Sequence, residues 1–137
     1  MKRCIALLLV LFCLAAAAAE PEEVTFPSGD LVLHGFISRP SGQGPFPAIL
    51  YNHGSEPRPG TKPELAELFS AHGYVFFVPH RRGQGRSPKD GRVLALQQAA
   101  GGALPLNELQ LEDQLAALAY LKGLAYVDKE RIAVAGC

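Results

Sequence analysis

Three short apolar runs constrain the fold of this chain more than any other feature. They span residues 47–51, 74–78 and 131–135, and none of them alternates between apolar and polar positions. Runs of this kind are typical of strands that are buried on both faces of a sheet. Helical patterns separate the runs, which predicts repeated units of strand, helix and strand. We therefore expect an α/β domain with a mainly parallel sheet.

The segment before the first run predicts an antiparallel opening to the sheet. Residues 24–26 and 31–37 are short apolar segments, and residues 27–30 between them read Pro, Ser, Gly and Asp. These are the residues that make tight turns between antiparallel strands. We expect a hairpin here, followed by a loop rich in proline and glycine over residues 39–46.

The first helix is expected between the runs at 47–51 and 74–78. Thr61, with Glu64 three residues later, has the pattern of a capping box, and the apolar residues over 65–69 share one helical face. Gly73 provides the left-handed residue that ends such a helix.

A second helix is expected before the last run, ending at Gly123. Its predicted apolar face consists of Leu111, Leu115, Leu118 and Leu121. Residues 88–108 are ambiguous, because the apolar pattern over 94–100 favours a short helix while the glycines and the proline over 101–105 oppose its continuation. We interpret residues 88–108 as an insertion over the sheet edge.

The first 19 residues have the layout of a secretory signal peptide. Only Lys2 and Arg3 are polar among them, and a run of alanines over 15–19 follows the apolar core. We expect cleavage after Ala19, a secreted or periplasmic product, and a domain over residues 20–137. The alternative is an uncleaved anchor, but the segment of about 16 apolar residues is shorter than the ~20 that cross a bilayer. No stable membrane span is expected after cleavage.

Charge and spacing exclude several other classes of function. Without the leader, the chain has 11 basic and 13 acidic residues and no basic stripe, so we expect no nucleic-acid partner. The four histidines lack the spacing of a zinc site, and Gly83 and Gly85 are followed by Pro88 where a dinucleotide fingerprint needs a third glycine. We therefore expect neither a metal nor a cofactor.

Loops at the carboxyl ends of the three runs are the places where a parallel sheet binds ligands. Residues 52–55 read Asn, His, Gly and Ser, where the glycine leaves backbone N–H groups able to face a developing oxyanion; an ordinary turn is the alternative. Residues 80–87 contain arginines that could bind a carboxylate, cap a helix or remain solvated. The last run ends in Gly136 and Cys137, the first two residues of a G-x-S-x-G nucleophile elbow.

With these three loops in order, the chain resembles the α/β-hydrolase superfamily. Within it, the stretches 46–54, 80–87 and 126–137 are similar to the dienelactone-hydrolase-like and prolyl-oligopeptidase-like serine hydrolases. The resemblance implies an α/β-hydrolase fold, with a mainly parallel sheet and an opening antiparallel hairpin, truncated at the nucleophile elbow.

The resemblance also implies roles for particular residues. The backbone at Gly54 and Ser55 would provide an oxyanion donor, with His53 shaping the loop, while Arg82 and Gly83 would line the site.

At the end of the chain, the resemblance assigns Gly136 as the first glycine of the elbow and Cys137 as the variable second residue. Asp128 and Arg131 would pair to orient the turn before the last strand. A cysteine nucleophile in G-x-C-x-G would need glycine where Ala135 stands, so we expect the nucleophile to be a serine after Cys137.

The expected function is an exported serine hydrolase that acts on ester or peptide-like acyl bonds of a small substrate. The acid and the histidine of the triad would follow the nucleophile, so residues 1–137 alone are expected to be inactive. One alternative is a non-catalytic secreted protein that uses the half-fold to bind a partner. Another is a thiol enzyme that uses Cys137.

Overall fold

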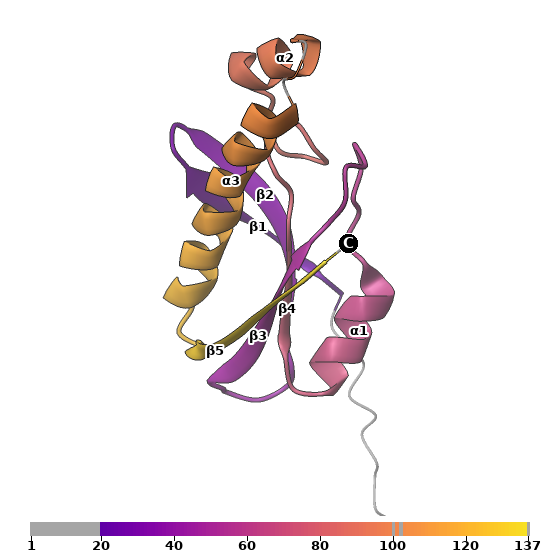
Figure 1. The fold of residues 1–137 in the computed structure, drawn as a ribbon. Helices are drawn as coiled ribbons and strands as arrows, with labels where there is room; N and C mark the ends of the chain where they lie inside the picture. Colours follow the sequence, from indigo (N-terminus) through magenta and orange to yellow (C-terminus); the bar gives the residue numbers. More distant parts are fainter. Residues whose placement is uncertain (1–19, 100, 102, 137) are drawn as a thin grey trace, which may run out of the picture.

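The computed structural model describes residues 20–99, 101 and 103–136 (Figure 1). The predicted signal peptide and Cys137 lie outside these residues. In chain order, the elements are β1 (Glu22–Ser28), β2 (Leu31–Ser38), β3 (Phe46–Asn52), α1 (Pro63–Ala71), β4 (Val75–Pro79), α2 (Gly91–Gln98), α3 (Ala103–Gly123) and β5 (Val127–Gly136).

The described strands form one sheet in the order β1-β2-β4-β3-β5. β1 pairs with β2 and β2 with β4 in antiparallel fashion, whereas β3 pairs in parallel with both β4 and β5. The predicted hairpin is confirmed, because only two residues separate β1 from β2 and so short a link can join only antiparallel neighbours. The three predicted apolar runs form the parallel half of this mixed sheet.

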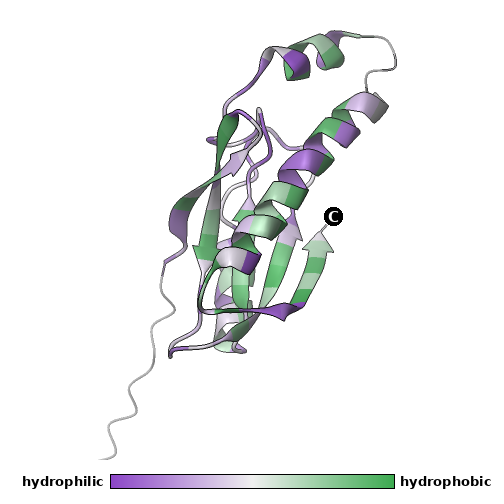
Figure 2. Cartoon of the chain, turned by 90° about the vertical axis from the view of Figure 1, so that its left-hand side faces the viewer, coloured by the Kyte–Doolittle hydropathy of each residue, from purple (hydrophilic) through white to green (hydrophobic). Residues whose placement is uncertain are grey.

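Two hydrophobic cores lie on opposite faces of the sheet, because alternate residues of each strand point to opposite sides. The larger core packs α3 against the sheet and includes Leu50 and Phe77. The smaller core packs α1 against the neighbouring residues Ile49 and Phe76. In Figure 2, apolar residues colour the central strands that both helices cover.

The buried face of α3 differs from the predicted one. Leu111 and Leu115 are 55% and 58% exposed, so their assignment to the core is wrong, although Leu121 is fully buried. The residues that α3 buries recur every four positions: Leu109, Asp113, Ala117 and Leu121. The apolar pattern misses this face because one of its members is an aspartate.

The helical insertion is partly as predicted. α2 confirms the short helix before residue 100, and the Asp90 side chain caps it by accepting from the Val93 N–H at 2.9 Å. α3 begins earlier than expected, since Pro105 lies in its first turn, where a missing N–H costs nothing. α2 contacts α3 beyond the carboxyl ends of the parallel strands (Figure 1).

The predicted capping box of α1 is wrong. The helix begins at Pro63, and its N-cap is Lys62 in a left-handed conformation with no side-chain cap hydrogen bond. Proline at the first position already has the helical φ angle and lacks one of the N–H groups that a cap would satisfy. Gly73 does adopt the predicted left-handed conformation, with φ of 83°. Among the described residues, no helix is long and apolar enough to cross a membrane.

Candidate active site

The last residues of β3 and β5 lie side by side. Asn52, the last residue of β3, lies opposite Gly136, the last residue of β5. A Cβ atom at Gly136 would collide with the backbone carbonyl of Asn52, so the close approach requires glycine at this position. Gly136 therefore lies next to the start of the β3 loop, which we define as residues 52–60.

A buried ion pair with helix α3 holds the β4 loop, residues 80–87, in place. Arg82 is 1% exposed, and its Nη2 lies 2.6 Å from Oδ1 of the equally buried Asp113 on α3. The Asp113 carboxylate also accepts from the Arg82 backbone N–H at 2.8 Å and from the Ser28 hydroxyl at 2.7 Å. These bonds to Asp113 raise the pKa of Arg82 further. Arg82 was expected to line the site, but its charge is neutralised by the buried Asp113 and stabilises the fold.

Arg81, the neighbouring residue, holds the β3 loop. Its Nη2 donates to the carbonyl of His53 at 3.0 Å and to the carbonyl of Gly54 at 2.6 Å. Its Nε donates to the side chain of Gln84, whose own amide nitrogen donates to the carbonyl of Glu56 at 3.0 Å. Side chains of the β4 loop therefore hold the β3 loop in place by donating hydrogen bonds to its carbonyl oxygens. We call the hydrogen bonds from Arg81 to the carbonyls of His53 and Gly54 the grip of Arg81.

This grip sets the direction of two backbone N–H groups. In a planar trans peptide, the N–H points opposite to the C=O of the same unit. Because the carbonyls of His53 and Gly54 point at Arg81, the N–H groups of Gly54 and Ser55 point away from it. Neither of these N–H groups donates to a backbone carbonyl of the described chain. Such a pair of donors is what an oxyanion hole requires.

The two histidines near these donors are held neutral and are engaged in the fold. His53 is 1% exposed, and burial lowers its pKa from 6.5 to about 4. Its Nδ1 donates to the Gly54 carbonyl at 2.9 Å, and its buried Nε2 finds no partner in the described chain. Burial also lowers the pKa of His80, whose Nε2 donates to the Gly60 carbonyl at 3.0 Å. His53 is thus a buried residue of the loop that it was expected to shape.

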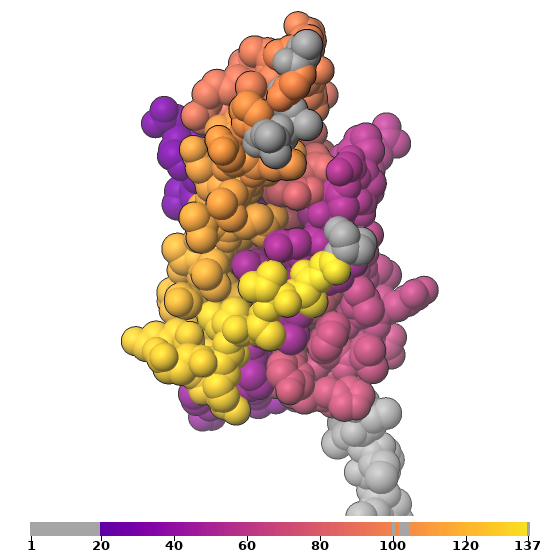
Figure 3. All heavy atoms as spheres, viewed as in Figure 1, coloured from indigo at the N-terminus to yellow at the C-terminus, as the bar shows by residue number. Residues whose placement is uncertain are grey.

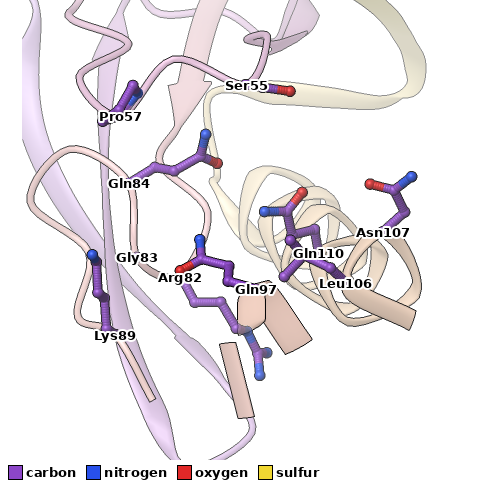
Figure 4. Close-up of a pocket in the computed structure, with 10 residues that line it drawn as sticks. All are labelled: Ser55, Pro57, Arg82, Gly83, Gln84, Lys89, Gln97, Leu106, Asn107 and Gln110. Atoms are coloured by element: carbon purple, nitrogen blue, oxygen red, sulfur yellow. The ribbon is translucent and has the colours of Figure 1, made fainter. Parts of the chain in front are cut away.

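A cavity of about 230 Å³ opens beside Ser55, between the two loops and the helices α2 and α3 (Figure 4). Gly83 lies on its wall in a left-handed conformation with φ of 77°. The residues that line the cavity are Ser55, Pro57, Arg82, Gly83, Gln84, Lys89, Gln97, Leu106, Asn107 and Gln110.

The predicted pair before the last strand is present. The Nε of Arg131 lies 2.6 Å from Oδ2 of Asp128, and the bond lowers the pKa of that carboxyl group. Both residues lie in the first half of β5, away from Gly136 at its end. The pair is therefore remote from the candidate oxyanion donors and belongs to the fold.

The structure brings together some predicted residues and adds others. His53, Gly54, Ser55, Arg82 and Gly83 lie around the two loops, whereas Cys137 lies outside the described residues. Sequence reasoning missed the grip of Arg81 and the role of Asp113. In the part of the chain that the structure describes, no three histidine, cysteine or acidic side chains are grouped as a metal site would need.

The sheet, its two helical layers and the loops at the strand ends have the α/β-hydrolase fold, and the structural neighbours of the chain are α/β hydrolases. The sequence itself matches no family model and no curated protein.

Three of these neighbours show how widely the matched hydrolases differ in sequence identity and in the share of their length that this chain covers. The acylaminoacyl peptidase of Pyrococcus horikoshii is 25% identical with a TM-score of 0.64, over 88% of this chain and 19% of the peptidase. The α/β hydrolase GrgF from a Penicillium species is 26% identical with a TM-score of 0.65, over 86% and 37%. A dienelactone hydrolase-like promiscuous phosphotriesterase from metagenomic libraries is 18% identical with a TM-score of 0.68, over 88% and 49%. The chain thus spans between a fifth and a half of these neighbours' lengths.

Proposed function

We propose that this chain is the amino-terminal portion of an exported serine hydrolase that acts on ester or peptide-like acyl bonds. The observation that carries the proposal is the grip of Arg81 on the carbonyls of His53 and Gly54, which leaves two backbone N–H groups directed away from it. The neighbours named above include a peptidase and a dienelactone hydrolase-like enzyme, which supports hydrolysis as the reaction class.

The proposed chemistry needs a nucleophile beside these donors. β5 ends opposite Asn52, so a serine directly after Cys137 would emerge next to the N–H groups of Gly54 and Ser55. Attack of its hydroxyl on an acyl carbon would place negative charge on the carbonyl oxygen, which these donors would stabilise. Neither His53 nor His80 is proposed as the base, because burial lowers the pKa of both rings and so makes them weak proton acceptors. The acid and the basic histidine of the triad would follow the nucleophile in the sequence.

The decisive experiment is to read the coding region beyond the Cys137 codon and to assay the encoded protein. We expect Ser-x-Gly to follow, and the purified protein should hydrolyse a p-nitrophenyl ester. Replacing that serine by alanine should abolish the turnover. A stop codon, or any residue other than serine at the next position, would contradict the proposal, as would turnover that survives the alanine variant. A reaction blocked by iodoacetamide and lost in Cys137→Ala would point to a thiol enzyme instead.

Export is the second part of the proposal. The basic start and the apolar run over residues 1–19 support a cleavable signal peptide. The mass of the protein recovered from the medium or the periplasm should correspond to a chain that begins at Glu20. Recovery of the uncleaved chain in the cytosol would contradict this part alone.

A further inference from the structure

The buried ring of His80 joins the β4 loop to the far end of the β3 loop. His80 is 3% exposed, and its Nε2 donates to the carbonyl of Gly60, the last residue of the β3 loop, at 3.0 Å. Its Nδ1 accepts from the backbone N–H of Arg86 at 3.4 Å. A neutral imidazole has one donor and one acceptor, so these two contacts use both ring nitrogens. The arrangement fits only the neutral ring with its proton on Nε2.

Main-chain hydrogen bonds fix the backbone of His80. Its N–H donates to the His34 carbonyl at 2.8 Å, and its own carbonyl accepts from the Ser87 hydroxyl at 2.6 Å. A Cβ atom at Gly85 would collide with the ring at Nδ1, so the backbone of Gly85 packs directly against this atom. The N–H of Gly85 in turn donates to the Pro57 carbonyl at 2.8 Å. A change at Nδ1 therefore acts on the segment that holds Pro57.

The ring of His80 also contacts the residue that precedes the candidate oxyanion donors. The rings of His80 and His53 lie edge to face, with their centroids 5.9 Å apart. The Nδ1 of His53 donates to the Gly54 carbonyl, to which Arg81 also donates. That carbonyl belongs to the same peptide unit as the N–H of Ser55. A displacement of the His80 ring therefore reaches the candidate donors by a second route.

Charged and titratable groups on four segments surround His80. Burial is the main cause that lowers its pKa, and His34 on β2 and Arg86 in the β4 loop act in the same direction. Glu23 on β1 acts against them, but its carboxylate is already paired with His34 and Arg86. His53 faces the ring from the β3 loop, and its own pKa of about 4 leaves it neutral above that pH. Among the described residues, no carboxylate pairs with His80 itself.

Protonation would add a second N–H group to the His80 ring, at Nδ1. This group would face the N–H of Arg86, with the backbone of Gly85 packed against the same atom. Two donors in this position repel each other, and a buried charge without a partner is costly. Because the backbone of His80 is fixed, residues 85 and 86 would have to move. The hydrogen bond from Gly85 to the Pro57 carbonyl would then be lost.

We propose that His80 is a positioning residue of the candidate active site. Its neutral ring holds the β3 loop, and with it the N–H groups of Gly54 and Ser55, in place, and its protonation releases them. The catalytic consequence of this release rests on the proposed function. The movement of the loop does not, since it requires neither a nucleophile nor a substrate.

NMR titration of the ¹⁵N-labelled full chain from about pH 7.5 to about pH 4.5 tests the proposal. The Cε1–H signal of His80 reports the protonation of its ring. We expect the amide signals of Gly54, Ser55 and Gly60 to shift with the same midpoint as this ring signal, at a pH below 6.5. The amide signal of Val127, at the start of β5, should not follow it.

Two substitutions of His80 separate its hydrogen bonds from its titration. His80→Gln keeps an amide donor for the Gly60 carbonyl but does not titrate, so the signals of Gly54 and Ser55 should stay in place and lose this titration step. His80→Phe keeps a flat ring without a donor, so the same signals should be displaced at every pH. His53→Gln is the matched control, because it removes the neighbouring buried histidine and should leave Gly60 titrating with the His80 ring.

The proposal is refuted if the signals of Gly54 and Ser55 do not follow the His80 ring, if they titrate unchanged in His80→Gln, or if the chain unfolds before the ring titrates. A midpoint that survives in His80→Gln but is lost in His53→Gln would assign the effect to His53 and also overturn the proposal. Failure of the proposed function is seen separately, as the absence of esterase turnover in the protein that extends beyond Cys137. A chain whose β3 loop follows His80 but which hydrolyses nothing would keep the role of His80 in the loop and remove the enzyme.

Discussion

The two loops that meet above the sheet are stabilised in different ways. The β4 loop is anchored by a buried ion pair with α3, and its turns are closed by its own bonds, such as the Ser87 N–H to the Gln84 carbonyl at 3.0 Å. The β3 loop, which presents the candidate oxyanion donors, depends on its neighbour. Its carbonyls at residues 53, 54, 56, 57 and 60 all accept hydrogen bonds from the β4 loop.

The difference shows that the conformation of the β3 loop, which carries the candidate oxyanion donors, is determined by its hydrogen bonds to the β4 loop. Figure 3 shows β5 lying open at the surface of the molecule. A rigid neighbour can hold the N–H groups of Gly54 and Ser55 in place before any substrate arrives, which is what preorganised stabilisation requires.

Removing the anchor should have the largest effect. Asp113→Ala leaves the Arg82 guanidinium buried without its main partner, and the loss of one member of a buried pair costs about 3–5 kcal/mol. The free energy of unfolding in urea should fall by this amount. Glu112→Ala is the control, because Glu112 is 59% exposed and 3.4 Å from Arg82, so its loss should cost less than about 1 kcal/mol. Equal losses for the two variants would show that the β4 loop has no special anchor.

Acidification should have the second largest effect on the free energy of unfolding, through the buried His53 of the β3 loop. The pKa of His53 is about 4 in the folded chain and 6.5 when unfolded, so the unfolded state binds more protons between these values. The contribution of His53 to the free energy of unfolding is therefore fully present above pH 6.5. It is lost as the pH falls to 4, and the loss is at most about 3 kcal/mol. The lowered pKa of His80 adds to the same slope. Urea titrations across this range should show a shallower dependence of the free energy of unfolding on pH in His53→Gln than in the unchanged chain.

Loss of the grip should have a smaller effect on stability and a specific effect on the β3 loop. Arg81→Met deprives the carbonyls of His53 and Gly54 of their donor, which should cost about 2 kcal/mol. The amide signals of Gly54 and Ser55 should shift and exchange faster, while those of residues 86 and 87 should stay. The exposed Arg86 provides the control variant Arg86→Met. Unchanged signals at Gly54 and Ser55 would disprove the dependence of one loop on the other.

The sequence predicts the strands well, because apolar runs and turn residues act locally. It fails where the deciding partner is distant. Asp113 lies 31 residues after Arg82, and no local pattern marks it as part of the buried face of α3. The leucines at 111 and 115 match the helical period better than the aspartate does, so the apolar pattern predicts the wrong face.

The candidate site was predictable only as a set of loops. Gly54 and Ser55 follow from a glycine at the end of a buried strand, which is a local signal. Arg81 and Arg82 are adjacent in the sequence and chemically identical, yet one grips the β3 loop and the other pairs with α3. The partner of each arginine depends on the direction in which its side chain leaves the turn. That direction is determined by the packing of the sheet against α3.

The close approach of Gly136 to the Asn52 carbonyl acts as a check on strand alignment. A slip of β5 by one residue in either direction would bring Ala135 or Cys137 opposite Asn52, and the Cβ atom of either would collide where glycine fits. Only the alignment that sets Gly136 opposite Asn52 therefore lets β3 and β5 pair up to their last residues.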